Sequence, residues 1–311
     1  MALVIVVLAS VAVGPGDILD PELGPAFARL RALRAAGAGV AGAALAVAGV
    51  LAQALFRNPL ASPSVLGATA GASFGGQLSL LALGTLGGIG GLEPELWVPL
   101  GCFGGAWLAV LVVIAVARRR RDELSLLLVG FVSSAVFLSA ASFVTSLAQD
   151  RWEVGRAVIS FALGGVTGVG PLQIGLSVPL VIAGLAVVAA SHRILDVLTS
   201  GEDEARALGV PVASVVRWSA IWIAVLVGAA VSISGNLGFV GLIAPHAART
   251  LVGPSHRRLV PAAVGFGFLV ACDALVRVVP SRSEIPLGVI TSLLGAPVFL
   301  HLLMSTRRSD G

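Results

Sequence analysis

Long runs of apolar residues, separated by short polar intervals, recur along most of this 311-residue chain. A transmembrane helix needs about 20 predominantly apolar residues, and several runs reach that length. A segment inside lipid must satisfy its own backbone N–H and C=O groups, so only helices or a closed barrel can span a membrane. The runs are continuously apolar rather than alternating, which favours helices over barrel strands. The sequence therefore predicts an all-α, polytopic transmembrane helical bundle.

About ten spans are expected, in a single domain that covers residues 1–311. Hydrophobic residues make up 57% of the chain and charged residues 12%, unlike a soluble domain. The first apolar run is short and could be a signal-peptide core, but it lacks a basic leader and an Ala-x-Ala site. We prefer a first helix with a clipped or misassigned start. The spans are expected at 2–13, 35–56, 67–91, 97–117, 124–147, 172–190, 218–234, 235–253, 260–279 and 287–304.

All 20 basic residues are arginine, and the chain contains no lysine. A phosphate-binding P-loop needs the lysine of its Gly-x-x-x-x-Gly-Lys-[Ser/Thr] motif. The chain therefore cannot carry a standard nucleotide-hydrolysing site, and if ATP drives it, another subunit binds the ATP and Mg²⁺. The isoelectric point near 10.7 does not indicate nucleic-acid binding, because the arginines lie at span ends rather than on one soluble face.

Residue patterns for catalysis or metal binding are missing from the sequence. Cys102 and Cys272 lie inside apolar runs, where they are expected to be small buried residues rather than a disulfide. The four histidines are scattered, and no Ser/His/Asp or Cys/His arrangement occurs at helical spacing. We expect no metal site, no cofactor and no covalent chemistry in this chain.

The segment 195–217 is the longest polar interval between the spans that follow Arg121. It carries a compact group of charged residues, the acidic residues 202–204 and Arg206. Small apolar residues lie among the charges, which suits contact with another protein. The alternative is an ordinary solvated loop between two membrane helices.

Arginine bias predicts the orientation, because cytoplasmic loops of membrane proteins carry an excess of basic residues. With a cytoplasmic N-terminus, ten spans place the C-terminus, the segment 195–217 and the arginine clusters 118–121, 257–258 and 307–308 on the cytoplasmic side. A smaller set of arginines then lies outside: Arg29, Arg31, Arg34, Arg151, Arg156, Arg277 and Arg282.

Four motifs, in order and at the right spacing, carry a family resemblance. They are Arg57-Asn58-Pro59-Leu60-Ala61 with Pro63; Gly201-Glu202 through Ala205-Arg206 to Leu208-Gly209; Gly238-Phe239-Val240-Gly241-Leu242 with Pro245-His246 and Arg249; and Glu284-Ile285-Pro286-Leu287-Gly288 with Thr291, Gly295-Ala296-Pro297 and Phe299. Over residues 29–305 the chain resembles the permease subunits of ABC importers for iron chelates, haem and vitamin B12.

This resemblance implies about ten helices, a second permease subunit (identical or paired), two cytoplasmic ATPase subunits and an extracytoplasmic substrate-binding protein. The substrate would cross the cytoplasmic (inner) membrane. An iron-siderophore is the most common cargo of the family, with haem and cobalamin as alternatives. The resemblance also implies that short coupling helices in 195–217 dock in the ATPase, through Gly201, Glu202, Ala205, Arg206, Leu208 and Gly209. The charges suit this, because acidic residues 202–204 would lie near a helix N-terminus, where the helix dipole favours negative charge, and Gly209 would end the helix.

In similar permeases, arginines at the positions of Arg31, Arg34 and Arg277 pair with acidic residues of the binding protein. The alternative is interfacial snorkelling, in which the charged head simply reaches water. The same resemblance gives structural roles, as bends or helix ends, to Asn58, Pro59, Pro245, His246, Pro286 and Pro297.

Similar permeases build much of the translocation path from the helix expected at 124–147, at the axis of the permease dimer. The candidates for lining it are Ser133, Ser134, Ser139 and Ser142. These hydroxyls could equally serve helix packing.

Asp273 is the notable carboxylate within a span, and an intramembrane acid is a functional candidate by default. A pair with Arg277, four residues later, would explain it sufficiently. The competing class is an ion-coupled secondary transporter, which would need a midplane acid or an inverted repeat, and no clear repeat is found.

Overall fold

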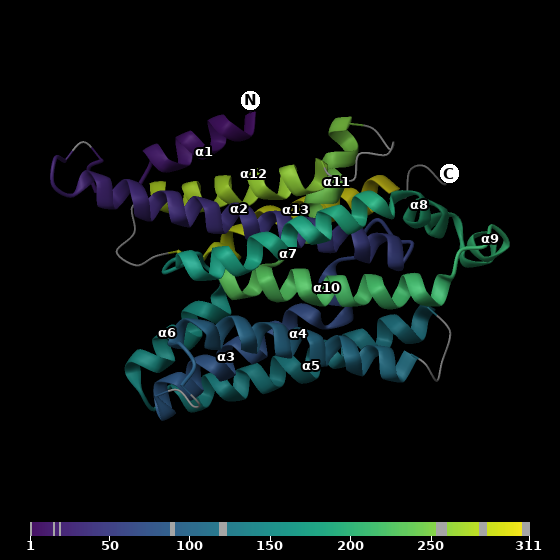
Figure 1. Ribbon diagram of the computed structural model, residues 1–311, viewed down its shortest axis with the longest axis horizontal. Helices are drawn as coiled ribbons and strands as arrows, with labels where there is room; N and C mark the ends of the chain where they lie inside the picture. Colours follow the sequence, from purple (N-terminus) through teal and green to yellow (C-terminus); the bar gives the residue numbers. More distant parts are fainter. Residues whose placement is uncertain are drawn as a thin grey trace.

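The structure, a computed structural model, describes residues 2–14, 16–18, 20–87, 91–117, 123–252, 260–279 and 285–306. Over these ranges the regular structure is helical, without a strand, which confirms the all-α prediction (Figure 1). Some residues named above lie outside the described ranges: Arg118–Arg121, Arg257, Arg258, Arg282, Glu284, Arg307 and Arg308.

Each of the ten predicted spans corresponds to a helix. In chain order the helices are α1 (Ala2–Ala12), α2 (Gly24–Leu55), the 3-10 helix η1 (Pro63–Leu66), α3 (Ala68–Leu86), α4 (Pro94–Ala117), α5 (Glu123–Ala148), α6 (Trp152–Leu163), α7 (Pro171–Ala190), α8 (His192–Ser200), α9 (Glu202–Ala207), α10 (Val212–Ser234), α11 (Val240–Val252), α12 (Val260–Val278) and α13 (Leu287–Thr306). Among the described residues, six helical segments are long and apolar enough to cross a membrane by length and composition.

Two predicted boundaries were wrong, and one helix was not predicted. Helix α2 begins at Gly24 rather than near residue 35. Pro25 lies in its first turn, where the missing N–H of proline costs nothing because N–H groups there have no acceptor within the helix. Helix α6 was not predicted, because its sequence is too polar for a span; it is amphipathic and buries Gly155 and Val158. Helix α10 begins at Val212, so the segment 195–217 includes its first turns.

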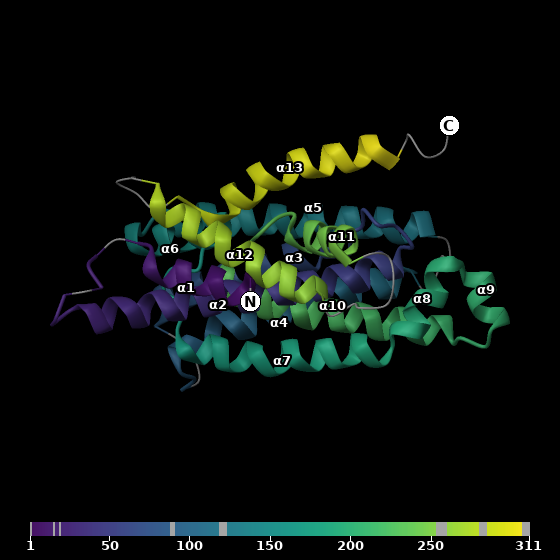
Figure 2. The ribbon, with the colours of Figure 1, turned by 90° about the horizontal axis from the view of Figure 1, so that it is seen from above.

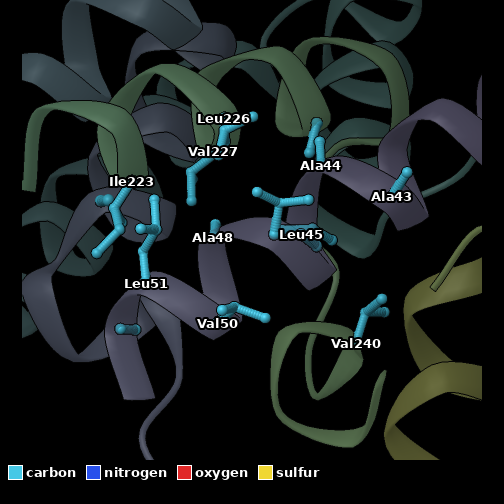
Figure 3. Packing of buried hydrophobic residues seen from close by; sticks show 14 of the residues in the cluster. Ala43, Ala44, Leu45, Ala48, Val50, Leu51, Ile223, Leu226, Val227 and Val240 are labelled. Atoms are coloured by element: carbon cyan, nitrogen blue, oxygen red, sulfur yellow. The ribbon is translucent and has the colours of Figure 1, made fainter. Parts of the chain in front are cut away.

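The long helices run roughly side by side along the long axis of the molecule (Figure 1). Helices α8 and α9 lie at one end of this axis, which we call the α9 end. Helix α6 and the start of α2 lie at the other, which we call the α6 end. In the centre, α2 packs against α10 and α11 through buried side chains (Figure 3): Ala44, Leu45, Ala48, Leu51, Ile223, Leu226, Val227 and Val240.

Glycines bring pairs of helices into backbone contact. A Cβ added at Gly42 of α2 would lie 2.1 Å from the carbonyl oxygen of Gly265 in α12. One added at Gly75 of α3 would lie 1.9 Å from the carbonyl oxygen of Gly101 in α4. Small residues at such crossings let helices associate in lipid, where no hydrophobic force drives them together.

The turn between α10 and α11 joins the ends of several helices. Phe239 in this turn has a left-handed φ of 64°, which is uncommon for a residue other than glycine. The N–H of Gly165 donates to the Ser234 carbonyl at 2.8 Å, and that of Leu287 donates to the Gly164 carbonyl at 2.9 Å. These bonds hold the C-terminus of α6 against the end of α10 and the start of α13.

Candidate functional site

The segment 195–217 forms a protruding pair of short helices at the α9 end (Figure 1). Helix α8 is amphipathic and anchors the pair, because Leu195 and Leu198 are buried in the core. Helix α9 opens with three acidic residues in its first turn and ends at Ala207, and Gly209 has a left-handed φ of 79°. The predicted acidic helix start and glycine stop are thus confirmed.

One apolar side chain, that of Leu208, projects beside the charged side chains of α9. Arg206 pairs with Glu202 at 2.5 Å and with Asp203 at 3.1 Å, both on the exposed surface. Ala205 is buried and holds the helix against the bundle, whereas Leu208 is 65% exposed. An exposed leucine beside an ion-paired surface can insert into an apolar pocket of another protein.

At the opposite end, Asp273 lies fully buried between two arginines. Nε of Arg34 in α2 donates to Oδ1 of Asp273 at 2.7 Å. Nη2 of Arg277 lies 2.9 Å from Oδ2 of the same carboxylate, which confirms the predicted pair within α12. The Arg34 partner was missed, since nothing in the sequence indicates a contact between residues so far apart.

The three arginines predicted to dock the binding protein differ in exposure. The side chains of Arg31 and Arg277 are buried and donate to the backbone around the end of α1. The Arg34 side chain is 18% exposed. Docking by these residues stays a prediction, and in this conformation Arg34 is the most accessible of the three.

Two polar pairs between helices were also missed. Nη1 of Arg249 in α11 donates to Oε1 of the buried Gln53 in α2 at 2.8 Å. The Thr145 hydroxyl of α5 donates to Oε1 of Gln77 in α3 at 2.9 Å, and Gln77 donates to Ser73. Glutamine inside an apolar run was the available signal, because a buried amide needs hydrogen-bond partners.

The four serines proposed to line the path do not share one face of α5. Ser133 is buried beside Gly67, and the Ser134 hydroxyl donates to the carbonyls of Gly130 and Ser64. Ser139 and Ser142 are exposed. The open face of α5 therefore presents the last two, and the first two contact other parts of this chain.

Asn58, Pro59 and Pro286 lie at helix ends or breaks, whereas Pro297, Pro245 and His246 lie inside helices. Helix α2 stops at Leu55, and the Asn58 side chain accepts a bond from the Leu60 N–H just beyond it, next to Pro59. Pro286 precedes α13, and Pro297 is exposed within it.

Pro245 and His246 were expected near the end of a short helix but lie in the middle of α11. Pro245 has no N–H to donate to the carbonyl of Gly241, one turn earlier. That carbonyl faces α2, where a Cβ added at Gly49 would lie 1.8 Å from its oxygen. The carbonyl freed by the proline therefore lies in this close contact between α11 and α2.

Among the described residues, no group of three or more His, Cys, Asp or Glu side chains could hold a metal ion. Cys102 and Cys272 are free and buried. The described polar side chains form hydrogen bonds and ion pairs between helices, and they form two polar surfaces at opposite ends of the bundle.

A multi-pass helical bundle with a charged helical pair protruding at one end is typical of the membrane subunit of a transporter. The chain belongs to the FecCD transport family, whose model matches residues 1–305. These are permeases of ABC importers.

Relatives and a solved structure agree with this assignment. The chain is 36% identical to the cobalamin import system permease protein BtuC of Halobacterium salinarum, over 84% of this chain and 69% of that protein. It is 35% identical to the Fe(3+) dicitrate transport system permease protein FecD of Escherichia coli, over 86% and 81%. It is also similar to a structure described as an inward-facing metal-chelate type ABC transporter, with a TM-score of 0.83 and 28% identity over 97% and 96%.

Proposed function

We propose that this chain carries a ferric chelate, in the first place an iron-siderophore, into the cytoplasm through the inner membrane. The similarity to an iron dicitrate permease and to a metal-chelate transporter structure supports this substrate class. The second candidate is cobalamin, which the similarity to BtuC supports.

Energy would enter through the segment 195–217, by contact with two ATPase subunits that bind ATP and Mg²⁺. The observation that carries this proposal is the projecting Leu208 on an anchored, charged helix pair. The absence of lysine supports it, because the chain itself lacks a P-loop. With the α9 end cytoplasmic, the C-terminus of α13 lies on the same side (Figure 1).

A second permease subunit would cover the side of the bundle formed by α5 and α13, which lie opposite α7 (Figure 2). Both helices expose large apolar side chains: Phe131, Val136 and Phe143 in α5, and Leu293, Leu300 and Met304 in α13. Ser139 and Ser142 lie among the exposed residues of α5, so a path between the two subunits would include their hydroxyls.

The α6 end would then face outward and receive the substrate-binding protein. Among the described residues of this end, Arg29, Arg151 and Arg156 are exposed and Arg34 is partly exposed. Positive charge on this surface would attract acidic lobes of the binding protein and accelerate their encounter.

The test is ligand-stimulated transport in proteoliposomes that contain this chain, its ATPase and its binding protein. The binding protein is loaded in turn with ferric siderophores, haem and cobalamin. We expect a ferric siderophore to stimulate ATP hydrolysis and uptake. Stimulation by cobalamin or haem alone would overturn the iron assignment. Uptake that survives an inactivated ATPase site but stops without a proton gradient would overturn the ABC mechanism.

A further inference from the structure

The C-terminal end of α1 accepts hydrogen bonds from arginine side chains of two other helices. Helix α1 is 11 residues long, and Val4, Ile5 and Leu8 are each more than half exposed, so its packing against the bundle is limited. The last carbonyl groups of any helix lack partners within the helix and carry the negative end of its dipole. In α1 these carbonyls face two guanidinium groups.

Arg31 in α2 donates in two directions at once. Its Nη1 donates to the carbonyls of Val11 and Ala12, both at 3.1 Å. Its Nη2 donates to the carbonyls of Gly14 and Gly16, both at 2.8 Å. The planar fork of one arginine therefore ties the end of α1 to the loop that follows it.

Arg277 in α12 completes the arrangement from the other side. Its Nη1 donates to the carbonyls of Ser10 at 2.8 Å and Val13 at 3.0 Å. Its Nη2 donates to the Ser10 hydroxyl at 2.5 Å and lies 2.9 Å from the Asp273 carboxylate. Asp273 thus forms an ion pair with the same arginine that donates hydrogen bonds to α1.

The loop backbone is shaped to fit this contact. Gly16 has a left-handed φ of 96°, and a Cβ there would lie 3.0 Å from the ring of Phe27. A Cβ at Gly14 would lie 3.1 Å from Nε of Arg31. Glycine at both positions lets the loop carbonyls approach the guanidinium.

We propose that Arg31 and Arg277 are positioning residues that clamp α1 onto α2 and α12. If α1 moved away, two buried guanidinium groups would lose their carbonyl acceptors, which is costly in a medium with little water. The clamp fixes α1 whether or not a binding protein is present, so it is separable from any docking role of the same arginines.

Substitution of Arg31 by lysine distinguishes the clamp from a docking role. Docking to an acidic partner depends mainly on positive charge, which lysine retains. The clamp depends on the arginine fork, which donates to four carbonyls in a fixed geometry that a single ammonium group cannot reproduce. Arg31→Lys is therefore expected to weaken the clamp.

A cross-link between α1 and α12 reports the clamp. A Cβ at Gly267 of α12 would lie 3.1 Å from Cδ2 of Leu3 in α1. In the full-length chain with Cys102→Ala and Cys272→Ala, the pair Leu3→Cys and Gly267→Cys should cross-link efficiently with a short bismaleimide, without the binding protein. Arg31→Met, Arg277→Met and Arg31→Lys should each lower the yield several-fold. Arg29→Met, which changes an exposed arginine at the same end, should leave the cross-linking yield unchanged.

Gly16→Ala tests the clamp without altering an arginine and should lower the yield, because alanine disfavours the φ of this residue. Each variant is first checked for monodisperse behaviour in detergent, and Gly16→Ala and Arg31→Lys serve if the methionine variants do not fold. Unchanged yields in the Arg31 and Arg277 variants would overturn the clamp. An equal fall in Arg29→Met would also overturn it, since the effect would then come from surface charge alone.

Discussion

Arg34 and Asp273 form an ion pair of 2.7 Å although 239 residues separate them in the chain. The pair joins α2 to α12 at the α6 end, and the Arg249–Gln53 hydrogen bond joins α2 to α11 at 2.8 Å. Between these ties, Gly42 packs against α12 with backbone in contact. Helix α2 is therefore fixed along its length to the two helices that follow α10.

Asp273→Asn should strongly destabilise the protein. The change leaves Arg34 and Arg277 without a carboxylate in a buried site, and breaking a buried ion pair by removing one partner costs about 3–5 kcal/mol. Thermal unfolding in detergent measures the effect. Asp203→Asn, whose carboxylate is exposed, is the control and should leave the Tm unchanged. A wild-type Tm for Asp273→Asn would contradict the structural role of this pair.

Gln53→Leu and Arg249→Leu should show coupling in a double-mutant cycle. Each single change leaves the other polar group buried without its acceptor or donor, so the double variant should be less destabilised than the sum of the two. A coupling energy of about 1 kcal/mol is expected for an interhelical bond in a membrane protein. Strictly additive effects on unfolding would show that the two side chains do not stabilise each other.

Gly42→Ala should destabilise the bundle by about 1–3 kcal/mol, because a methyl group would push against the α12 backbone and the two helices would have to separate. The matched control is Gly104→Ala in α4, where a Cβ would meet nothing within 4 Å. Alanine there should be neutral or slightly stabilising, as in other helices. Equal stability of the two variants would mean that the α2–α12 crossing is looser than described.

Leu208→Asp should uncouple ATP hydrolysis from uptake. It places a charge where an apolar side chain would enter the ATPase, and Leu208 is 65% exposed, so the fold should be unaffected. We expect uptake in proteoliposomes to fall at least tenfold, at unchanged Tm, with weaker co-purification of the ATPase. Leu208→Met retains an apolar side chain and should transport normally. Normal uptake by Leu208→Asp would remove this residue from the coupling surface.

The sequence by itself determined the class of fold and the order of the helices. Continuous apolar runs require helices in lipid whatever their partners are, so each predicted span corresponds to a helix. The acidic start of α9 and the glycine after it were also predictable, because capping and dipole effects act within a few residues. Helix α6 was missed, since an amphipathic helix of 12 residues does not have the apolar length of a span.

Only the tertiary structure decided what the polar residues within the spans do. It gave Asp273 a second partner in Arg34, separated the four serines of α5 between a packed face and an open face, and buried Arg31 and Arg277 against the backbone around the end of α1. These outcomes depend on which helices become neighbours. Which helices become neighbours depends on glycine contacts and interdigitating side chains between distant segments. The local periodicity of the sequence does not indicate these pairs.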